Sequence, residues 1–150
     1  MTKSEIEAYL YKHIPVTQAL GVKVVHFSNS RVELSAPLSN NINHRFTAFG
    51  GSISSLLITT AWSYLRLLFD DEGEGQIPRI VIGKSNTNYL KPIVSDFSSE
   101  LLIPDEDTLN HFIEMYHRFG KARITLKAKI EEDDATYAEF EGDFVVMERK

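Results

Sequence analysis

Apolar and polar residues alternate with a period of two through much of this chain, which is the pattern of strands that bury one face. The alternation is clearest in the last third, where an apolar residue occupies nearly every second position from Ala122 to Ile130 and from Ala138 to Val146. This alternation, or a high content of Val, Ile and aromatic residues, predicts six strands: residues 20–27, 31–38, 79–90, 97–103, 122–130 and 138–146.

The N-terminal residues follow a helical period instead. Ile6 and Leu10 lie four residues apart, and Ser4 precedes Glu7 by three residues, which is the spacing of a capping box. We therefore predict a short opening helix that ends before Pro15, because proline disfavours helical backbone in the residue before it.

Two further helices are predicted along the chain. Residues 53–69 contain neither Pro nor Gly, and their apolar side chains would cover most of a helix circumference. With its first turn this helix spans about residues 50–69, and we expect it to be buried on nearly all sides. Residues 105–118, about the span of the third helix, have one apolar face, and Gly120 is a suitable C-terminal cap.

The order of these elements indicates the fold class. A helix is followed by two strands, and this unit occurs three times along the chain. Hairpin connections between successive strands predict a six-stranded antiparallel sheet, which could bury one apolar helix by curling round it. We expect an α+β protein in which residues 1–150 form one domain, because 150 residues lie within the usual domain size.

Composition narrows the class of function. The hydrophobic fraction of 43% and the charged fraction of 25% are typical of globular proteins, and the net charge of -5 disfavours nucleic acid as a partner. The absence of cysteine excludes disulfides, thiolate nucleophiles and Cys-bound metal. The N-terminus lacks the apolar run of a signal peptide, and no segment reaches the about 18 apolar residues of a membrane span. A cytoplasmic location is therefore expected.

The loop before the central helix carries a specific motif. Asn43 lies seven residues before Gly50, and Gly50 and Gly51 open the predicted helix. This spacing resembles the hotdog thioesterase superfamily. Four segments in order are similar to the thioesterase domain often fused behind a GNAT-type acetyltransferase: residues 49–52, 88–92, 120–124 and 140–145. The resemblance covers the chain from about residue 15 onward, and the domain is expected to stand alone here.

The resemblance implies a hotdog fold and hydrolysis of an apolar acyl thioester carried by CoA or by an acyl carrier protein. Attack by water creates an oxyanion that needs a hydrogen-bond donor, and unpaired N–H groups at a helix N-terminus can supply one. The resemblance assigns this role to the N–H of Gly50. The alternative, that Gly50 and Gly51 only allow close packing at the helix start, stays open.

Two residues of the loop are candidates for the chemistry. The side-chain amide of Asn43 would hold the attacking water or the thioester carbonyl, and the open alternative is an Asx turn in a polar loop. His44 is a secondary candidate as general base near neutral pH, with simple solvation beside Arg45 as its alternative.

The central helix departs from the family pattern. In many relatives a carboxylate lies eight residues after the first glycine, and here that position is Ile58. Thr59 is the nearest polar residue, and its hydroxyl can orient water but is a poor base. Small hydroxyl residues follow one side of the helix: Ser52, Ser55, Thr59 and Ser63. Ser63 is expected to form a packing seam, whereas the other three either line the substrate channel or belong to the same seam. The candidate substrate-binding residues are Phe49, Gly51, Ser52, Ser55, Ile58 and Trp62, of which Trp62 has core packing as its alternative.

Ligands other than the thioester are not indicated. The cations available for CoA or carrier phosphates are Lys84, Lys91, Arg118, Lys121 and Arg123, and no contact is assigned to them. The five histidines show no metal-ligand spacing, so neither a metal nor a cofactor is predicted. A homodimer, or a dimer of dimers, is predicted because an antiparallel sheet must protect its open edges.

Two other functions remain open on this fold. A noncatalytic acyl-thioester-binding protein would explain why Ile58 replaces the usual acid. A hydratase or dehydratase ranks last, because such relatives use a His with an acidic partner, and the acid is missing.

Overall fold

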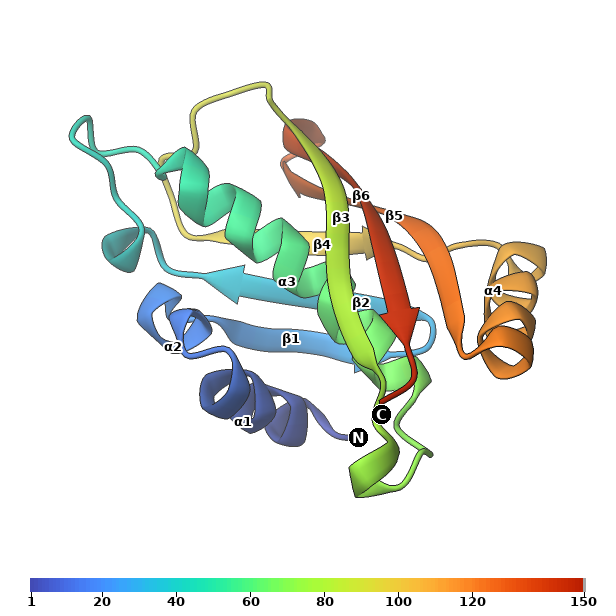
Figure 1. The fold of residues 1–150 in the computed structure, drawn as a ribbon. Helices are drawn as coiled ribbons and strands as arrows, with labels where there is room; N and C mark the ends of the chain where they lie inside the picture. Colours follow the sequence, from blue (N-terminus) through green and yellow to red (C-terminus); the bar gives the residue numbers. More distant parts are fainter. Residues whose placement is uncertain (150) are drawn as a thin grey trace.

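The central helix of the computed structural model runs along the concave side of a curled sheet (Figure 1). The structure describes residues 1–149. Its helices are α1 (Lys3–His13), α2 (Val16–Leu20), α3 (Gly50–Leu68) and α4 (Glu106–Phe119), with 3-10 turns at Leu38–Asn40 and Glu74–Gln76. α3 is buried on nearly all sides, as its apolar sequence predicts, and the face that carries Ser55, Ile58 and Trp62 is partly exposed. Its bounds agree with the predicted 50–69. None of the helices described within residues 1–149 has the length and hydropathy needed to cross a membrane.

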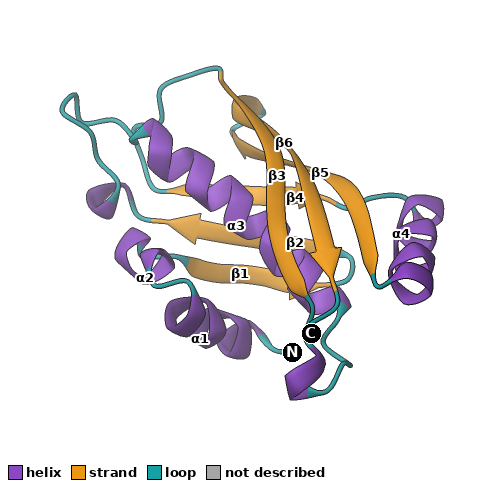
Figure 2. Ribbon diagram, in the orientation of Figure 1, coloured by secondary structure: helices purple, strands orange, loops and turns teal. Residues whose placement is uncertain are grey.

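Six antiparallel strands form one sheet, which confirms the predicted fold class (Figure 2). They are β1 (Lys23–Ser28), β2 (Arg31–Ala36), β3 (Arg79–Tyr89), β4 (Phe97–Leu102), β5 (Lys121–Glu132) and β6 (Ala135–Met147). Their order across the sheet is β1-β2-β4-β5-β6-β3. The third strand in sequence therefore lies at one edge, beside the last, and β1 lies at the other edge.

The start of the chain differs in detail from the prediction. The capping box that opens α1 pairs Thr2 with Glu5, two residues before the predicted pair Ser4 and Glu7. Ser4 lies inside the helix, and the carboxylate of Glu7 instead accepts the backbone N–H of Val24 in β1, at 3.1 Å. The prediction was wrong because Glu7 finds its partner in a strand seventeen residues away. The short helix α2 was not predicted.

The amphipathic helix α4 packs against the end of α3. The ring of Phe69 meets those of Phe112 and Tyr116 at centroid distances of 6.1 and 4.7 Å. Asp105 caps the first turn of α4, and Gly120, at a φ of 69°, ends the helix in a left-handed conformation as predicted. β5 begins at the next residue.

Candidate functional site

The loop before α3 is held at its base by a buried asparagine. The side-chain amide of Asn41 donates to the carbonyls of Leu20 and Pro37, both at 2.8 Å, and the carbonyl of Asn41 accepts the N–H of Phe49 at 2.7 Å. These bonds tie the loop to the end of α2 and to the residue that follows β2. Asn41 was not predicted as a site residue, because nothing local distinguishes it from Asn40 or Asn43.

Asn43 organises the tip of this loop. Its Oδ1 accepts the backbone N–H groups of Arg45, at 2.8 Å, and Thr47, at 3.1 Å, and its Nδ2 donates to the Thr47 hydroxyl at 2.8 Å. A side-chain oxygen that accepts the N–H two residues on is an Asx turn, which was the alternative left open for this residue. One of the two amide hydrogens of Asn43 remains available to a ligand or a water molecule.

The tip itself points away from the body of the protein. His44, Arg45 and Phe46 are all exposed, and Phe46 has 77% of its surface accessible with a positive φ of 64°. No hydrogen bond or ion pair of the described residues involves the imidazole of His44. His44 is therefore not held beside the start of α3 in the single chain.

The start of α3 presents two backbone donors. The N–H groups of Ser52 and Ile53 both donate to the Phe49 carbonyl, whereas those of Gly50 and Gly51 have no partner among the described residues. No side chain caps this end. The two unpaired N–H groups carry the positive end of the helix dipole, so they can bind a partly negative carbonyl oxygen.

Two aromatic rings stand over the glycines. A Cβ at Gly51 would lie 2.5 Å from a carbon of the Phe49 ring, so a larger residue there would push this exposed ring aside. A Cβ at Gly50 would meet the ring of Tyr89 at 3.6 Å, an ordinary contact, so packing does not require glycine at that position. The Tyr89 hydroxyl donates to the Gly50 carbonyl at 3.0 Å. Phe49 and Tyr89 remain 57% and 54% exposed beside the donors.

Tyr89 was not assigned to the site from sequence. It ends β3, and only the tertiary fold brings it to Gly50, thirty-nine residues away. The available signal was its place in residues 88–92, one of the segments that carry the family resemblance.

The hydroxyl residues of α3 bond mainly to their own helix. Thr59 donates to the Ser55 carbonyl and Ser63 to the Thr59 carbonyl, each at 2.7 Å. Ser52, Thr59 and Ser63 are buried and Ser55 is half-buried. The Ser63 geometry agrees with the packing seam predicted for it. Because the Thr59 proton is committed to the backbone, its hydroxyl can only accept a hydrogen from a water molecule.

Ile58 and Trp62 lie one turn apart on α3, and both are partly exposed. The indole of Trp62 donates to the Ile80 carbonyl at 3.2 Å and stacks on Tyr9 of α1 at 6.1 Å. This face of α3 therefore looks into the space between α1 and β3. α3 itself contains no Asp or Glu, and no metal-binding cluster of His, Asp or Glu occurs among residues 1–149 as described.

The chain matches one protein family over nearly its whole length and is similar to several solved structures. The profile of a family described as "Putative thioesterase (yiiD_Cterm)" matches residues 3–148. A protein of unknown function from Chlorobaculum tepidum TLS is 26% identical, with a TM-score of 0.87 over 98% of this chain and 94% of its own. A putative thioesterase from Shewanella oneidensis is 25% identical, with a TM-score of 0.81 over 97% and 96% of the two chains. These two chains hold little beyond the matched domain, so neither includes a fused acetyltransferase.

A more distant structure shares the fold alone. The thioesterase from Haemophilus influenzae is 15% identical and has a TM-score of 0.74 over 99% of this chain and 92% of its own.

Proposed function

This chain belongs to the putative thioesterase family whose profile covers residues 3–148, and from that premise we propose that it hydrolyses an acyl thioester of CoA or of an acyl carrier protein at the N-terminus of α3. The observation that carries the proposal is the pair of unpaired N–H groups at Gly50 and Gly51, which open a 19-residue helix. We place this reaction in a single cytoplasmic domain that needs no cofactor.

The proposed reaction is attack by water on the thioester carbonyl carbon. The Gly50 N–H donates to the carbonyl oxygen, and this bond strengthens as the oxygen becomes an oxyanion. The free amide hydrogen of Asn43 holds the water or the same oxygen, while Thr59 accepts a hydrogen from the water. The C–S bond then breaks, and the departing thiolate takes the proton that the water loses. His44 is the candidate base if the loop tip brings it to the water.

The acyl chain is proposed to follow the partly exposed face of α3. Ile58 and Trp62 supply its apolar wall, and Phe49, Gly51, Ser52 and Ser55 surround the carbon atoms next to the thioester. An apolar chain gains about 0.8 kcal/mol for each CH₂ that this face removes from water. The protein would therefore favour acyl groups with several methylenes over acetyl.

A noncatalytic acyl-thioester-binding protein is the second candidate, and the composition of α3 favours it. α3 contains no carboxylate, and Ile58 occupies the position at which many relatives have an acid. A hydrolysis assay across acyl-CoA chain lengths, with thermal-shift binding measured on the same samples, separates the two functions. Turnover supports the hydrolase, whereas binding without turnover at any length supports the second candidate.

The role of the Gly50 N–H can be tested by removing that one donor. Gly50→Pro lacks the N–H, and proline is favoured at the first position of a helix, so α3 should still form. The extended ψ of 133° at Phe49 is also the conformation favoured before proline. We expect kcat to fall by about 10² to 10³, the usual loss for one oxyanion donor.

Gly50→Ala is the matched control, because it keeps the N–H and its Cβ meets Tyr89 only at contact distance. Equal activity of the Pro and Ala variants would show that the Gly50 N–H takes no part in the reaction.

We also propose a homodimer joined along the β3 edges, because the two edges of the sheet differ. Side chains of α1 bond to the backbone at the β1 edge: Glu7 to the Val24 N–H, Lys3 to the Val25 carbonyl and Tyr11 to the Val22 carbonyl. On β3 the one such bond among the described residues is from Trp62 to Ile80. Val81, Ile82 and Tyr89 are also exposed apolar residues of this strand. An unpaired apolar edge favours pairing with a second copy.

Sedimentation at micromolar concentration tests the dimer, which should have twice the 17.1 kDa mass of the chain. Ile82→Lys should dissociate it, whereas Leu102→Lys, at a somewhat more accessible residue of β4, should not. A wild-type protein that sediments only as a monomer would contradict the proposal.

A further inference from the structure

The outer face of the sheet, turned away from α3, has two halves of different charge. In the half near the β5–β6 turn, each lysine of β5 stands opposite a carboxylate of β6. The pairs are Lys127 with Glu141 and Lys129 with Glu139. Opposite charges on facing positions balance each other, so this half of the face is close to neutral.

In the other half the cations face apolar side chains. Lys121 of β5 and Arg79 of β3 stand on either side of Met147, and Arg123 stands opposite Val145. None of these three cations is in an ion pair with the described residues. The strand register therefore leaves three unneutralised charges together on one surface of a protein with a net charge of -5.

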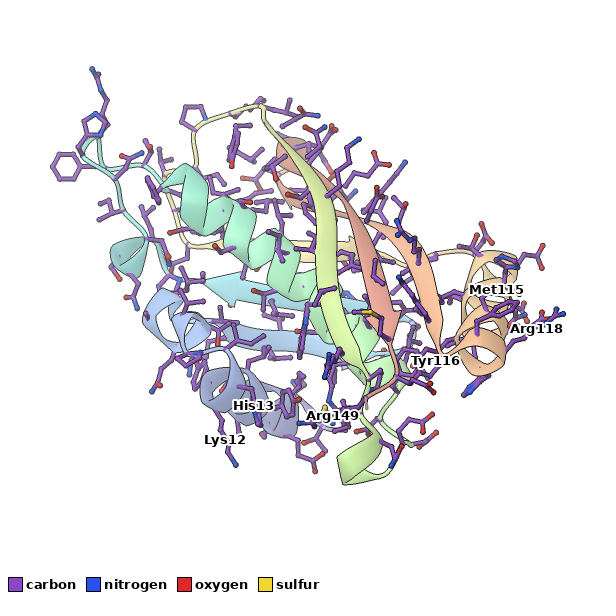
Figure 3. All side chains as sticks on the ribbon, viewed as in Figure 1. Lys12, His13, Met115, Tyr116, Arg118 and Arg149 are labelled. Atoms are coloured by element: carbon purple, nitrogen blue, oxygen red, sulfur yellow. The ribbon has the colours of Figure 1, made fainter. Side chains whose placement is uncertain are left out.

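A hollow adjoins these cations. β4 pairs with β5 only from Lys127 onward, so α4 lies beside the first half of β5 (Figure 1). The space between them is about 500 Å³ and is lined by His111, Met115, Phe119, Lys121, Ala122 and Arg123. The Phe119 ring is 64% exposed, with the Arg118 guanidinium 5.2 Å from its centroid. Figure 3 shows Arg118 on the outer part of α4, and Tyr116 on the side toward the strands.

Glu148 and Asp107 are the carboxylates near this hollow, and neither is in an ion pair with Lys121 or Arg123 among the described residues. Glu148 packs over Gly120, where a Cβ would lie 2.6 Å from its carboxyl carbon. Asp107 lies in the neighbouring hollow, beyond Arg123. Lys121, Arg123, Phe119 and Met115 thus form a cationic pocket with an aromatic wall, here called the α4–β5 pocket.

We infer that the α4–β5 pocket binds the phosphorylated nucleotide end of coenzyme A, with phosphates on Lys121 and Arg123 and the adenine ring against Phe119 and Met115. Unpaired cations beside an exposed ring suit a ligand that joins phosphate groups to a flat base. A carrier protein would present one phosphodiester and no base. The inference rests on the proposed thioesterase function, because it names the carrier of the acyl group.

The pocket lies far from the Gly50 donors of its own chain. α3 separates them, and its 19 residues span about 28 Å. In the β3-paired dimer, however, antiparallel pairing sets the Arg79 end of one strand beside the Tyr89 end of the other. Tyr89 touches Gly50, and Arg79 lies two strand spacings, about 10 Å, from Lys121. The pocket of one protomer would therefore hold the nucleotide of the thioester bound at the helix start of its partner.

Calorimetric titration with CoA and with adenosine 3′,5′-bisphosphate tests the pocket without any need for turnover. Lys121→Ala combined with Arg123→Ala should weaken binding of both ligands by at least about tenfold. Lys127→Ala combined with Lys129→Ala removes the same charge from the same face of β5, and should change binding less than about twofold. Melting temperatures of the two double variants establish that both are folded.

Steady-state kinetics show which part of the substrate the pocket binds. With an acyl-CoA substrate the Lys121/Arg123 variant should raise KM and leave kcat unchanged, and with the acyl-pantetheine thioester, which lacks the nucleotide, it should behave as wild type. Equal losses in both double variants, or equal losses with both substrates, would overturn the inference, as would weaker binding of an acyl carrier protein alone. Hydrolysis of acyl-CoA without any binding of the bisphosphate overturns the pocket and leaves the proposed function standing. Binding of the bisphosphate without hydrolysis of any thioester would support the pocket and contradict the proposed function.

Discussion

Replacing Asn43 by Ala and by Asp separates the two roles that one side chain combines. Its Oδ1 accepts two backbone N–H groups of the loop, its Nδ2 donates to Thr47, and one amide hydrogen remains for the thioester or water. Alanine removes all of these bonds. Aspartate keeps the two accepted bonds, and the Thr47 hydroxyl can reverse its direction and donate to the carboxylate.

The expected magnitudes follow from those bonds. Each contributes about 0.5 to 1.5 kcal/mol, and the bond to the Arg45 N–H is exposed, so the three together stabilise the loop by about 2 kcal/mol. At about 2 to 4 °C per kcal/mol, Asn43→Ala should lower Tm by about 4 to 8 °C. Asn43→Asp should stay within about 2 °C of wild type.

Single-turnover kinetics complete the comparison. Asn43→Asp lacks the amide hydrogen, so kcat should fall on the order of a hundredfold while ligand affinity barely changes, because the lost bond matters mainly in the transition state. An Asp variant with wild-type or higher kcat would refute the donor role. An Asp variant as unstable as the Ala variant would refute the account of the loop.

Two further substitutions test other parts of the structure. Ile58→Asp supplies the carboxylate that α3 lacks. If residue 58 faces the water, kcat should rise by at least about tenfold. A folded variant with unaltered turnover would show that residue 58 does not face the water. Asp105→Ala should lower Tm at pH 7, whereas Asp105→Asn, which keeps the cap acceptor, should not. The bond from the Thr108 N–H lowers the pKa of Asp105, so its stabilisation is complete above the ordinary Asp pKa of about 3.9 and is lost as pH falls through the lower folded pKa. The Tm difference between wild type and Asp105→Ala should therefore persist at pH 5 and close in strong acid.

Much of the fold could be predicted from neighbours along the chain. The alternation from Ala122 to Ile130 identifies a strand with one buried face, and Gly120 marks a helix end, because both depend on residues within a few positions of each other. The apolar circumference of residues 53–69 likewise required a helix enclosed by other elements. The position of Gly50 and Gly51 at its start followed from the same local pattern and from the family resemblance.

The tertiary structure decided which side chains have distant partners. Asn40, Asn41 and Asn43 are chemically equal in sequence, yet Asn41 is buried because the loop docks on carbonyls from α2 and from the segment after β2. Glu7 bonds to a strand rather than to its own helix for the same kind of reason.

The pairing and order of the strands decided which residues lie beside Lys121, Lys127 and Tyr89. Lys121 and Lys127 belong to the same alternating pattern, and only the pairing of β5 with β6 sets one opposite Met147 and the other opposite Glu141. Tyr89 reaches Gly50 only because β3 crosses to the far edge of the sheet. Local sequence specifies the period of an element and the face it buries, whereas the partners across that face depend on the docking of segments tens of residues apart, whose free energy is shared over the whole core.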